Sequence, residues 1–193
     1  SKVLEQFRAL SFGKLIDKYR LLEEELPELR ADLPALEIQE LTTPEELDEF
    51  RKLLETEDTL YIAANEDLSD LAVYLGGKAY TAQQGVLGFM EWPQLLDGVF
   101  APARNKVVHD CKSIMTQLLG QGREIGGFQY DTALAAYLLE PARSGYPLKE
   151  LLERYCNLPI ENGIAGEAAA IAKLHGVLPE LVKEQGMERV YYD

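Results

Sequence analysis

The spacing of apolar residues along the chain predicts a sheet of short strands with helices between them. Between residues 36 and 104, five apolar runs have the length and composition of strands. The runs are residues 36–41, 60–64, 71–75, 78–81 and 85–89. The first should lie at an edge, the second should be central, and Gly76-Gly77 should form a hairpin turn. After the first strand a helix should begin at Thr43, because Pro44 and Glu46 follow it as in a capping box.

Residues 105–141 predict a strand, a helix, a strand and a helix in that order. The apolar run at residues 106–108 is typical of a buried strand, and apolar residues at helical spacing follow over residues 111–119. Asp110 is suited to cap that helix. A second strand is expected over residues 125–130. The βαβα order predicts an α/β fold, with a sheet covered by helices.

The second helix of this unit should begin after Asp131 and end at Pro141. Asp131 has the side chain of a helix N-cap. Leu134, Tyr137 and Leu138 fall on one face of the helix. Further helices are expected over residues 92–100, 146–155 and 164–175, and Pro179 should kink or restart the last of them.

The first 35 residues predict a segment separate from this domain. Apolar residues at three- and four-residue spacing predict helix over residues 1–26, and two prolines indicate a linker over residues 27–35. The chain should therefore divide into an N-terminal helical linker segment, residues 1–35, and a domain over residues 36–193. Ser1 in place of methionine suggests that the domain was excised from a longer chain.

Composition fits a globular domain and argues against nucleic-acid binding by this chain alone. The 193 residues are 47% hydrophobic, which is enough for a substantial core. The net charge is −14, with more than half of the excess acid in residues 1–58, so the average field repels phosphate. No apolar run is long enough to cross a membrane, and no secretory leader pattern is present. Cys111 and Cys156 do not make a disulfide framework, and free thiols fit a cytoplasmic protein.

Four motifs follow one another along this βαβα unit. They are Asp110-Cys111-Lys112, Gly122-Arg123-Glu124-Ile125-Gly126-Gly127, Tyr130-Asp131-Thr132 and Leu138-Leu139-Glu140-Pro141. Their order and spacing resemble the 3′–5′ exonuclease-like domain of bacterial DNA polymerase I. That family has an Asn-or-Asp-x-Lys turn, a Gly-Ile-Glu-Leu-x-Gly segment, and a Phe-Asp-Thr segment opening a helix that ends in Leu-x-Pro. The resemblance implies a ribonuclease H-like mixed β-sheet flanked by α-helices, followed in the parent chain by a polymerase domain.

Active members of that family use two divalent metal ions, which activate water and stabilise the leaving oxyanion. Four carboxylates hold the ions, and a tyrosine orients the water. The resemblance places the family's Asp-x-Glu pair at Ala63 and Asn65, its helix Asp at Ile114, its Tyr at Ile164 and its late Asp at Ala170. None of these five side chains has a carboxylate or a phenol, and Mg²⁺ requires oxygen ligands. The resemblance therefore predicts an inactive domain with no catalytic residue, no bound metal and no other cofactor.

Two alternatives remain open. The first is an active metal-dependent 3′–5′ exonuclease whose acids have moved to Glu66, Asp67, Asp110 and Glu167. Shifting the first motif by one residue offers Ala64 and Glu66, which supplies only one acid. The second is a protein-interaction module, which an exposed apolar patch would favour.

Other chemistry-bearing residues have simpler interpretations. His109, Asp110 and Cys111 are adjacent in sequence, and neighbours on a strand point to opposite faces, so a strand end and a helix cap explain them. Two histidines and two cysteines are too scattered for zinc, and no phosphate-binding loop is present. The sequence thus predicts a vestigial domain that acts as a structural scaffold for the adjoining polymerase domain in DNA replication and repair. Its partner should be that polymerase domain, with DNA reached only through the parent protein, and the chain should be a cytoplasmic monomer.

Overall fold

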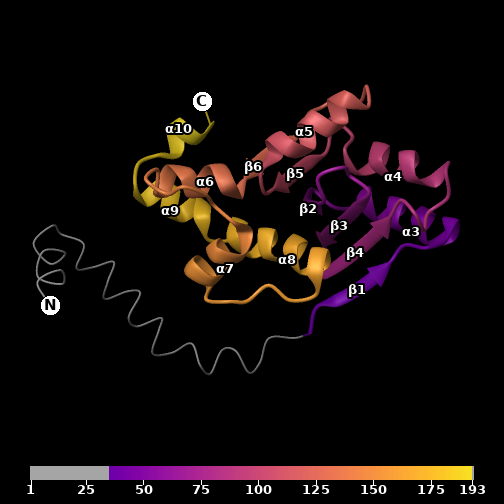
Figure 1. Cartoon of the computed structure of the whole chain (residues 1–193), viewed down its shortest axis with the longest axis horizontal. Helices are drawn as coiled ribbons and strands as arrows, with labels where there is room; N and C mark the ends of the chain where they lie inside the picture. The colour runs from indigo at the N-terminus through magenta and orange to yellow at the C-terminus, as the bar shows by residue number, and fades with distance from the viewer. Residues whose placement is uncertain (1–34, 193) are drawn as a thin grey trace, which may run out of the picture. The chain divides into compact units, whose positions relative to one another are not determined.

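A computed structural model describes residues 35–192, which form a six-stranded mixed sheet flanked by helices (Figure 1). The strands are β1 (Glu37–Glu40), β2 (Thr59–Ala64), β3 (Asp70–Leu75), β4 (Lys78–Gln83), β5 (Asn105–Val108) and β6 (Phe128–Asp131). The helices are α3 (Pro44–Leu54), α4 (Glu91–Val99), α5 (Cys111–Gly120), α6 (Thr132–Leu139), α7 (Leu148–Cys156), α8 (Gly163–His175), α9 (Leu178–Glu184) and α10 (Glu188–Tyr192). The helix predicted over residues 1–26 lies outside the described residues, as does the predicted linker except for its last residue. The boundary between residues 35 and 36 stays a prediction.

The sheet has the strand order β1-β4-β3-β2-β5-β6, which confirms an edge position for β1 and a central one for β2. Strands β2, β3 and β4 form an antiparallel meander, while β1 pairs with β4, β5 with β2, and β6 with β5 in parallel. The turn between β3 and β4 is at Gly76-Gly77, where φ is +57° and +87°. Residues that have a side chain rarely adopt positive φ values, so glycine suits this turn. The predicted mixed α/β sheet is confirmed.

Two clusters of apolar side chains hold the helices to the sheet. The first cluster contains alternate residues of β2 and β3, together with the buried sides of α3, α4 and α5. The residues of β2 and β3 between them belong to the second cluster. The second cluster also contains the buried sides of α6, α7, α8 and α9. Successive strand residues point to opposite faces, so a sheet that is apolar on both faces needs helices on both. The result is a helix–sheet–helix arrangement.

The start of α3 follows the predicted capping box. The Thr43 hydroxyl accepts a hydrogen bond from the Glu46 amide at 3.3 Å, and the Glu46 carboxylate accepts one from the Thr43 amide at 3.0 Å. These bonds satisfy two amides that a helix start leaves without an intrahelical partner.

The strand predicted over residues 85–89 is wrong, because that stretch is a loop between β4 and α4. Strand β4 is already paired on both sides, with β1 and β3, so it offers no free edge to a following strand. The amides of Val86 and Leu87 instead turn back to the Gln83 carbonyl at 3.0 Å each. Only Leu87 in this loop is buried, while Val86, Phe89 and Met90 are exposed.

The strand predicted over residues 125–130 begins later, at Phe128. Gly126 and Gly127 precede it and lie against the backbone of Pro102 and Arg104. This close approach of two chain segments suits glycine, and the Gly127 carbonyl accepts a hydrogen bond from the Lys106 amide at 2.7 Å just before the strand begins. Across the described residues, no helix is both long enough and apolar enough to cross a bilayer.

Candidate functional site

The first two predicted site positions, Ala63 and Asn65, lie at the end of strand β2. Ala63 is 5% exposed and belongs to the apolar cluster under α8. Asn65 directly follows the strand and closes the turn to β3. Its amide oxygen accepts a hydrogen bond from the Asp70 amide at 2.9 Å, and its amide nitrogen donates to the Ser69 hydroxyl at 2.9 Å. The polar group of Asn65 is therefore occupied by the turn.

Two more of the predicted site positions, Ile164 and Ala170, lie on helix α8. The helix lies across β2 and β3, and Ala170 is 2% exposed in the same cluster as Ala63. Ile164 is half-buried against that cluster. Three predicted site positions thus come together, and all three bear aliphatic side chains.

A close backbone contact determines how α8 begins. Gly166 is buried, and a Cβ at this position would collide with the carbonyl of Glu161, in the loop that leads into the helix. The loop can lie this close to the first turn of α8 only because residue 166 is glycine.

Ile114, the fifth predicted position, lies apart from the other four. It is on α5, is 5% exposed, and belongs to the apolar cluster that includes Val108 and Leu118. Its aliphatic side chain fills the interface between α5 and the sheet, where a carboxylate would carry a large desolvation cost.

The four acids of the alternative site are distributed over three places. Glu66 and Asp67 are exposed in the turn between β2 and β3, Asp110 is exposed at the start of α5, and Glu167 is on α8. The Asp67 carboxylate accepts a bond from the Ser69 amide at 3.0 Å, and hydrogen bonds with Ser69 lower the pKa of Asp67. Within residues 35–192, no three His, Cys, Asp or Glu side chains gather into a group that could hold a metal ion.

A pocket of about 270 Å³ lies between the β1–β4 edge of the sheet and the start of α8. It is lined by Ile38, Glu40, Leu41, Thr42, Asp70, Thr81, Ala82, Gln83, Val86, Asn162, Ile164 and Ala165. Of the predicted site positions, only Ile164 lines it. The Asp70 carboxylate on its wall accepts a hydrogen bond from Asn65 at 3.3 Å. The pocket is thus next to the expected cleft, with mixed polar and apolar walls.

Comparison with known proteins relates this fold to DNA polymerases. No protein-family model matches the chain. A stretch of 54 residues is 43% identical to DNA polymerase I of Mycobacterium leprae, and 41% identical to DNA polymerase I of Mycobacterium tuberculosis. The chain is homologous to a segment of DNA polymerase I. The matched stretch is 28% of this chain and only 6% of either relative.

Solved structures share the fold of this domain over 75–81% of the chain. One is "POL domain of Pol1 from M. smegmatis complex with DNA primer-template and dNTP", with a TM-score of 0.68 and 23% identity, covering 79% of this chain and 29% of that chain. Another is RNase D of Trypanosoma brucei, with a TM-score of 0.61 and 14% identity over 75% of this chain and 65% of that chain. NrnC of Brucella melitensis, bound to pGG, has a TM-score of 0.56 and 16% identity over 81% of this chain and 87% of that chain. At these identities the likeness establishes the fold, which is that of the ribonuclease H-like 3′–5′ exonucleases.

Asp131 joins two helix starts. Its carboxylate accepts bonds from the Ala133 and Leu134 amides at 2.8 and 3.3 Å, which confirms the predicted cap of α6. It also accepts bonds from the Asp110 and Cys111 amides at 3.1 and 2.8 Å, at the start of α5. Asp110 occupies the predicted N-cap position of α5, but its carboxylate accepts a bond from the Ser113 hydroxyl instead of a backbone amide. Sequence reasoning missed this second role of Asp131, since the partner amides are about twenty residues away in the chain.

Both thiols, Cys111 and Cys156, have raised pKa values. Burial, followed by hydrogen bonding to Asp131, raises the pKa of Cys111 to about 12. Burial likewise raises the pKa of Cys156 to about 11. A thiol is nucleophilic as its thiolate, so both residues are unreactive at neutral pH. This agrees with a structural interpretation of the His109-Asp110-Cys111 sequence.

Both histidines are partly or largely buried. His109 Nδ1 lies 2.9 Å from the Thr132 hydroxyl, and its pKa is lowered by burial against the opposing effect of Asp131 and Asp110. His175 packs between the rings of Tyr61 and Tyr130, with centroid distances of 5.7 and 4.9 Å. Burial lowers its pKa as well. Burial therefore favours the neutral form of both imidazoles.

Stability should fall as the pH drops from 7.5 to 5.5. An unfolded histidine titrates near pH 6.5, while His109 and His175 titrate lower in the folded chain. Below pH 6.5 the unfolded chain therefore binds protons that the folded chain does not, and folding free energy is lost. Glu167 opposes this trend, because burial raises its pKa.

Urea unfolding at both pH values, on the wild type and His175→Gln, measures this effect. The decrease in midpoint should be smaller in the variant. Equal decreases would show that His175 does not contribute.

Proposed function

We propose that this chain is a catalytically inactive 3′–5′ exonuclease-like domain of a DNA polymerase I, and that it serves as a structural scaffold for the adjoining polymerase domain. One observation carries the proposal. Ala63 and Ala170 stand where the resemblance requires two metal-binding carboxylates, and both are packed in one apolar cluster between β2 and α8. Methyl groups cannot bind Mg²⁺, which takes oxygen ligands.

The surroundings of these alanines support inactivity further. A metal pair at this place would need charged groups in a cluster of alanine, isoleucine and leucine side chains. Burying unpaired charge there is costly. The nearest polar position of the motif, Asn65, uses its amide group in the β2–β3 turn. Asn65 therefore serves the turn.

Homology to a segment of polymerase I, combined with aliphatic residues at the proposed ligand positions, supports a scaffold role. The parent protein would synthesise DNA in replication and repair, in the cytoplasm, and this domain would space and support its polymerase domain. Contacts would be made through the N-terminal segment and the C-terminal helix α10. DNA would be reached only through the parent protein, which fits a chain with a net charge of −14.

A protein-interaction role is the second candidate, and one loop favours it. Between β4 and α4, the Phe89 side chain is 94% exposed and that of Met90 is 65% exposed. Aromatic and methionine side chains are enriched at protein interfaces. In this candidate function, a replication partner would dock on the loop.

Calorimetry with Mn²⁺ on the purified chain, at millimolar metal and low salt, tests the inactive assignment. We expect no binding heat, and no Mg²⁺- or Mn²⁺-dependent degradation of single-stranded DNA, because the carboxylates are missing. Degradation that is lost in Glu167→Gln would overturn the proposal in favour of a relocated site. Two bound metal ions at sub-millimolar affinity would overturn it as well. Leu119→Ser, at an exposed position on α5, is the matched control for any general loss of folding.

A further inference from the structure

The loop between α7 and α8 ends in an asparagine that is followed by glycine. Of the four asparagines in the chain, only Asn162 has this neighbour. The side-chain amide of an asparagine can react with the backbone nitrogen of the next residue, and a side chain on that residue hinders the approach. A Cβ built on Gly163 would have no neighbour within 4 Å, and both residues are exposed to water. The surroundings of this dipeptide therefore leave the two reacting groups accessible.

The backbone conformation of Asn162 leaves its side chain without a capping role. Asn162 occupies the N-cap position of α8, with φ +64° and ψ +30°. An N-cap residue ordinarily has an extended backbone, from which its side chain reaches the amides of the first helical turn. In the left-handed conformation of Asn162 the side chain makes no such bond. The helix therefore does not hold the side-chain amide.

The nitrogen of Gly163 is well placed to act as a nucleophile. Gly163 is the first residue of α8, and the first amides of a helix have no intrahelical acceptor. The positive end of the helix dipole lies at the same place. This partial charge favours the deprotonated nitrogen, which is the species that attacks a side-chain amide.

We propose that Asn162 is a site of spontaneous deamidation. The Gly163 nitrogen attacks Cγ of Asn162, the bond from Cγ to Nδ2 breaks, and ammonia leaves with the proton of the Gly163 amide. Water then opens the cyclic imide that has formed. Breaking the bond from the nitrogen to Cγ gives aspartate, and breaking the bond from the nitrogen to the backbone carbonyl carbon gives isoaspartate. This inference goes beyond the proposed function and does not depend on it.

The packing of the loop against α8 sets the rate of this reaction. With ψ at +30°, the Gly163 nitrogen points away from the Asn162 side chain, so the Cα–C bond must rotate before the attack. The rotation moves Glu161 relative to the first turn of α8. It therefore breaks the close contact of the Glu161 carbonyl with Gly166, and the 3.4 Å hydrogen bond from the Gly166 amide to the Asn162 carbonyl.

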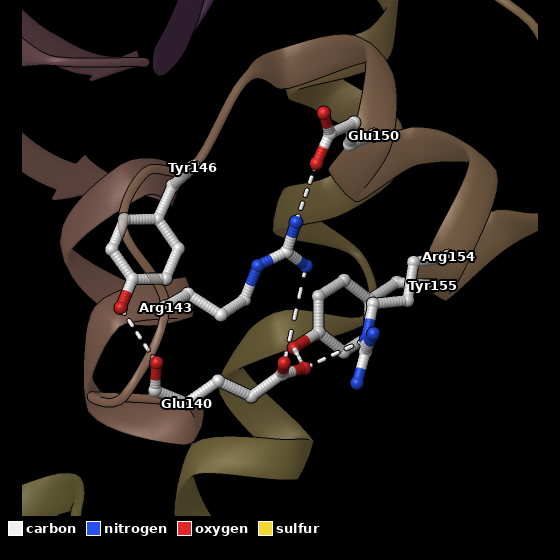
Figure 2. A network of polar contacts seen from close by, with 6 residues as sticks. All are labelled: Glu140, Arg143, Tyr146, Glu150, Arg154 and Tyr155. Atoms are coloured by element: carbon white, nitrogen blue, oxygen red, sulfur yellow. Dashed lines mark hydrogen bonds and ion pairs between the residues drawn. The ribbon is translucent and has the colours of Figure 1, made fainter.

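The other end of the loop is anchored. Figure 2 shows a network centred on Glu140, whose carboxylate accepts bonds from Arg154 at 2.7 Å and from the Tyr155 hydroxyl at 2.8 Å. These bonds tie the end of α7 to the end of α6. Asn157 follows α7, is half-buried, and donates its backbone amide to the Glu153 carbonyl at 3.0 Å. We therefore expect the loop to open at its α8 end, where Asn162 lies.

The two products should affect α8 in opposite ways. Aspartate places a negative charge at the start of the helix, where the dipole favours it. Isoaspartate leads the main chain through the former side chain and lengthens it by a methylene group between Glu161 and Gly166. The Glu161 carbonyl then loses its position against Gly166, and the start of the helix that carries Ile164 and Ala170 is disturbed.

Tandem mass spectrometry of the folded 193-residue chain, incubated at 37 °C and pH 8.5, tests the assignment. Asn162 should convert to the acid at least tenfold faster than Asn157, which also has a left-handed backbone, with φ +51°, but precedes leucine. Chromatography should separate an aspartate and an isoaspartate product. Equal rates at the two asparagines would overturn the inference, and so would conversion of Asn162 in urea but not in the folded chain.

Three variants test the chemistry and the role of the loop. Asn162→Gln should abolish the conversion at this position, because glutamine would have to form a larger ring. Gly166→Ala should raise the rate several-fold, because its Cβ displaces the Glu161 carbonyl, while Gly98→Ala on α4 should leave the rate unchanged. Circular dichroism at the incubation temperature verifies that each variant is folded. Conversion that persists in Asn162→Gln would overturn the site, and a rate in Gly166→Ala no higher than in the wild type would overturn control by the loop.

Discussion

Gly166→Ala should lower the free energy of unfolding by about 3 kcal/mol, as expected when a side chain is forced into a tightly packed site. The added Cβ would collide with the Glu161 carbonyl, which is backbone and cannot move away as the end of a flexible side chain can. For a domain of this size the melting temperature should fall by roughly 6–12 °C. Thermal unfolding followed by circular dichroism measures the change. The effect would show that close packing of the loop against α8 fixes the position of Ile164 and Ala170.

Gly98→Ala is the matched control for this substitution. Gly98 lies in α4, where an added Cβ would meet only a Leu54 methyl group at 3.6 Å, an ordinary contact. Because alanine is the better helix former, stability should rise by up to about 1 kcal/mol. If both variants lost the same stability, glycine flexibility rather than the Glu161 contact would be responsible, and the packing argument for α8 would fail.

Asp131→Ala should cost about 3 kcal/mol of stability. The substitution removes the cap of α6, worth about 1 kcal/mol, and leaves the Asp110 and Cys111 amides without their charged acceptor, at about 1 kcal/mol or more each. Urea unfolding at pH 7.5 measures the loss. An unchanged midpoint would contradict the structural role of Asp131.

Asp131→Asn distinguishes the two functions of this side chain. The amide oxygen can still cap α6 and accept the bond from the Asp110 amide, which uses the same oxygen, but the amide nitrogen cannot accept a bond from the Cys111 amide. We expect about half of the loss caused by alanine. A loss as large as that of alanine would mean that the bond from the Cys111 amide dominates, and no loss would mean that this bond contributes little.

The sequence by itself determined the order of the elements and most of their ends. Local signals are sufficient where one short segment decides the outcome, as in the capping box at Thr43 and the glycine turn at Gly76-Gly77. A continuous apolar run identified β2, and the motifs around Asp131 led to the polymerase resemblance. Ala63 and Ala170 could be named from the chain as the positions of two family carboxylates, and that assignment stays a prediction.

Tertiary structure decided the features that depend on contacts between residues far apart in the chain. Residues 85–89 have the composition of a strand, but β4 has no free edge for them, and pairing is a property of the whole sheet. The Asp110 and Cys111 amides donate to the Asp131 carboxylate because the fold places them close to it. The face of α6 that carries Leu134 and Tyr137 was evident from helical spacing. That this face points away from the sheet was not evident from the spacing. The fold decided it, because the small alanines on the opposite face pack more closely against the sheet than leucine and tyrosine can.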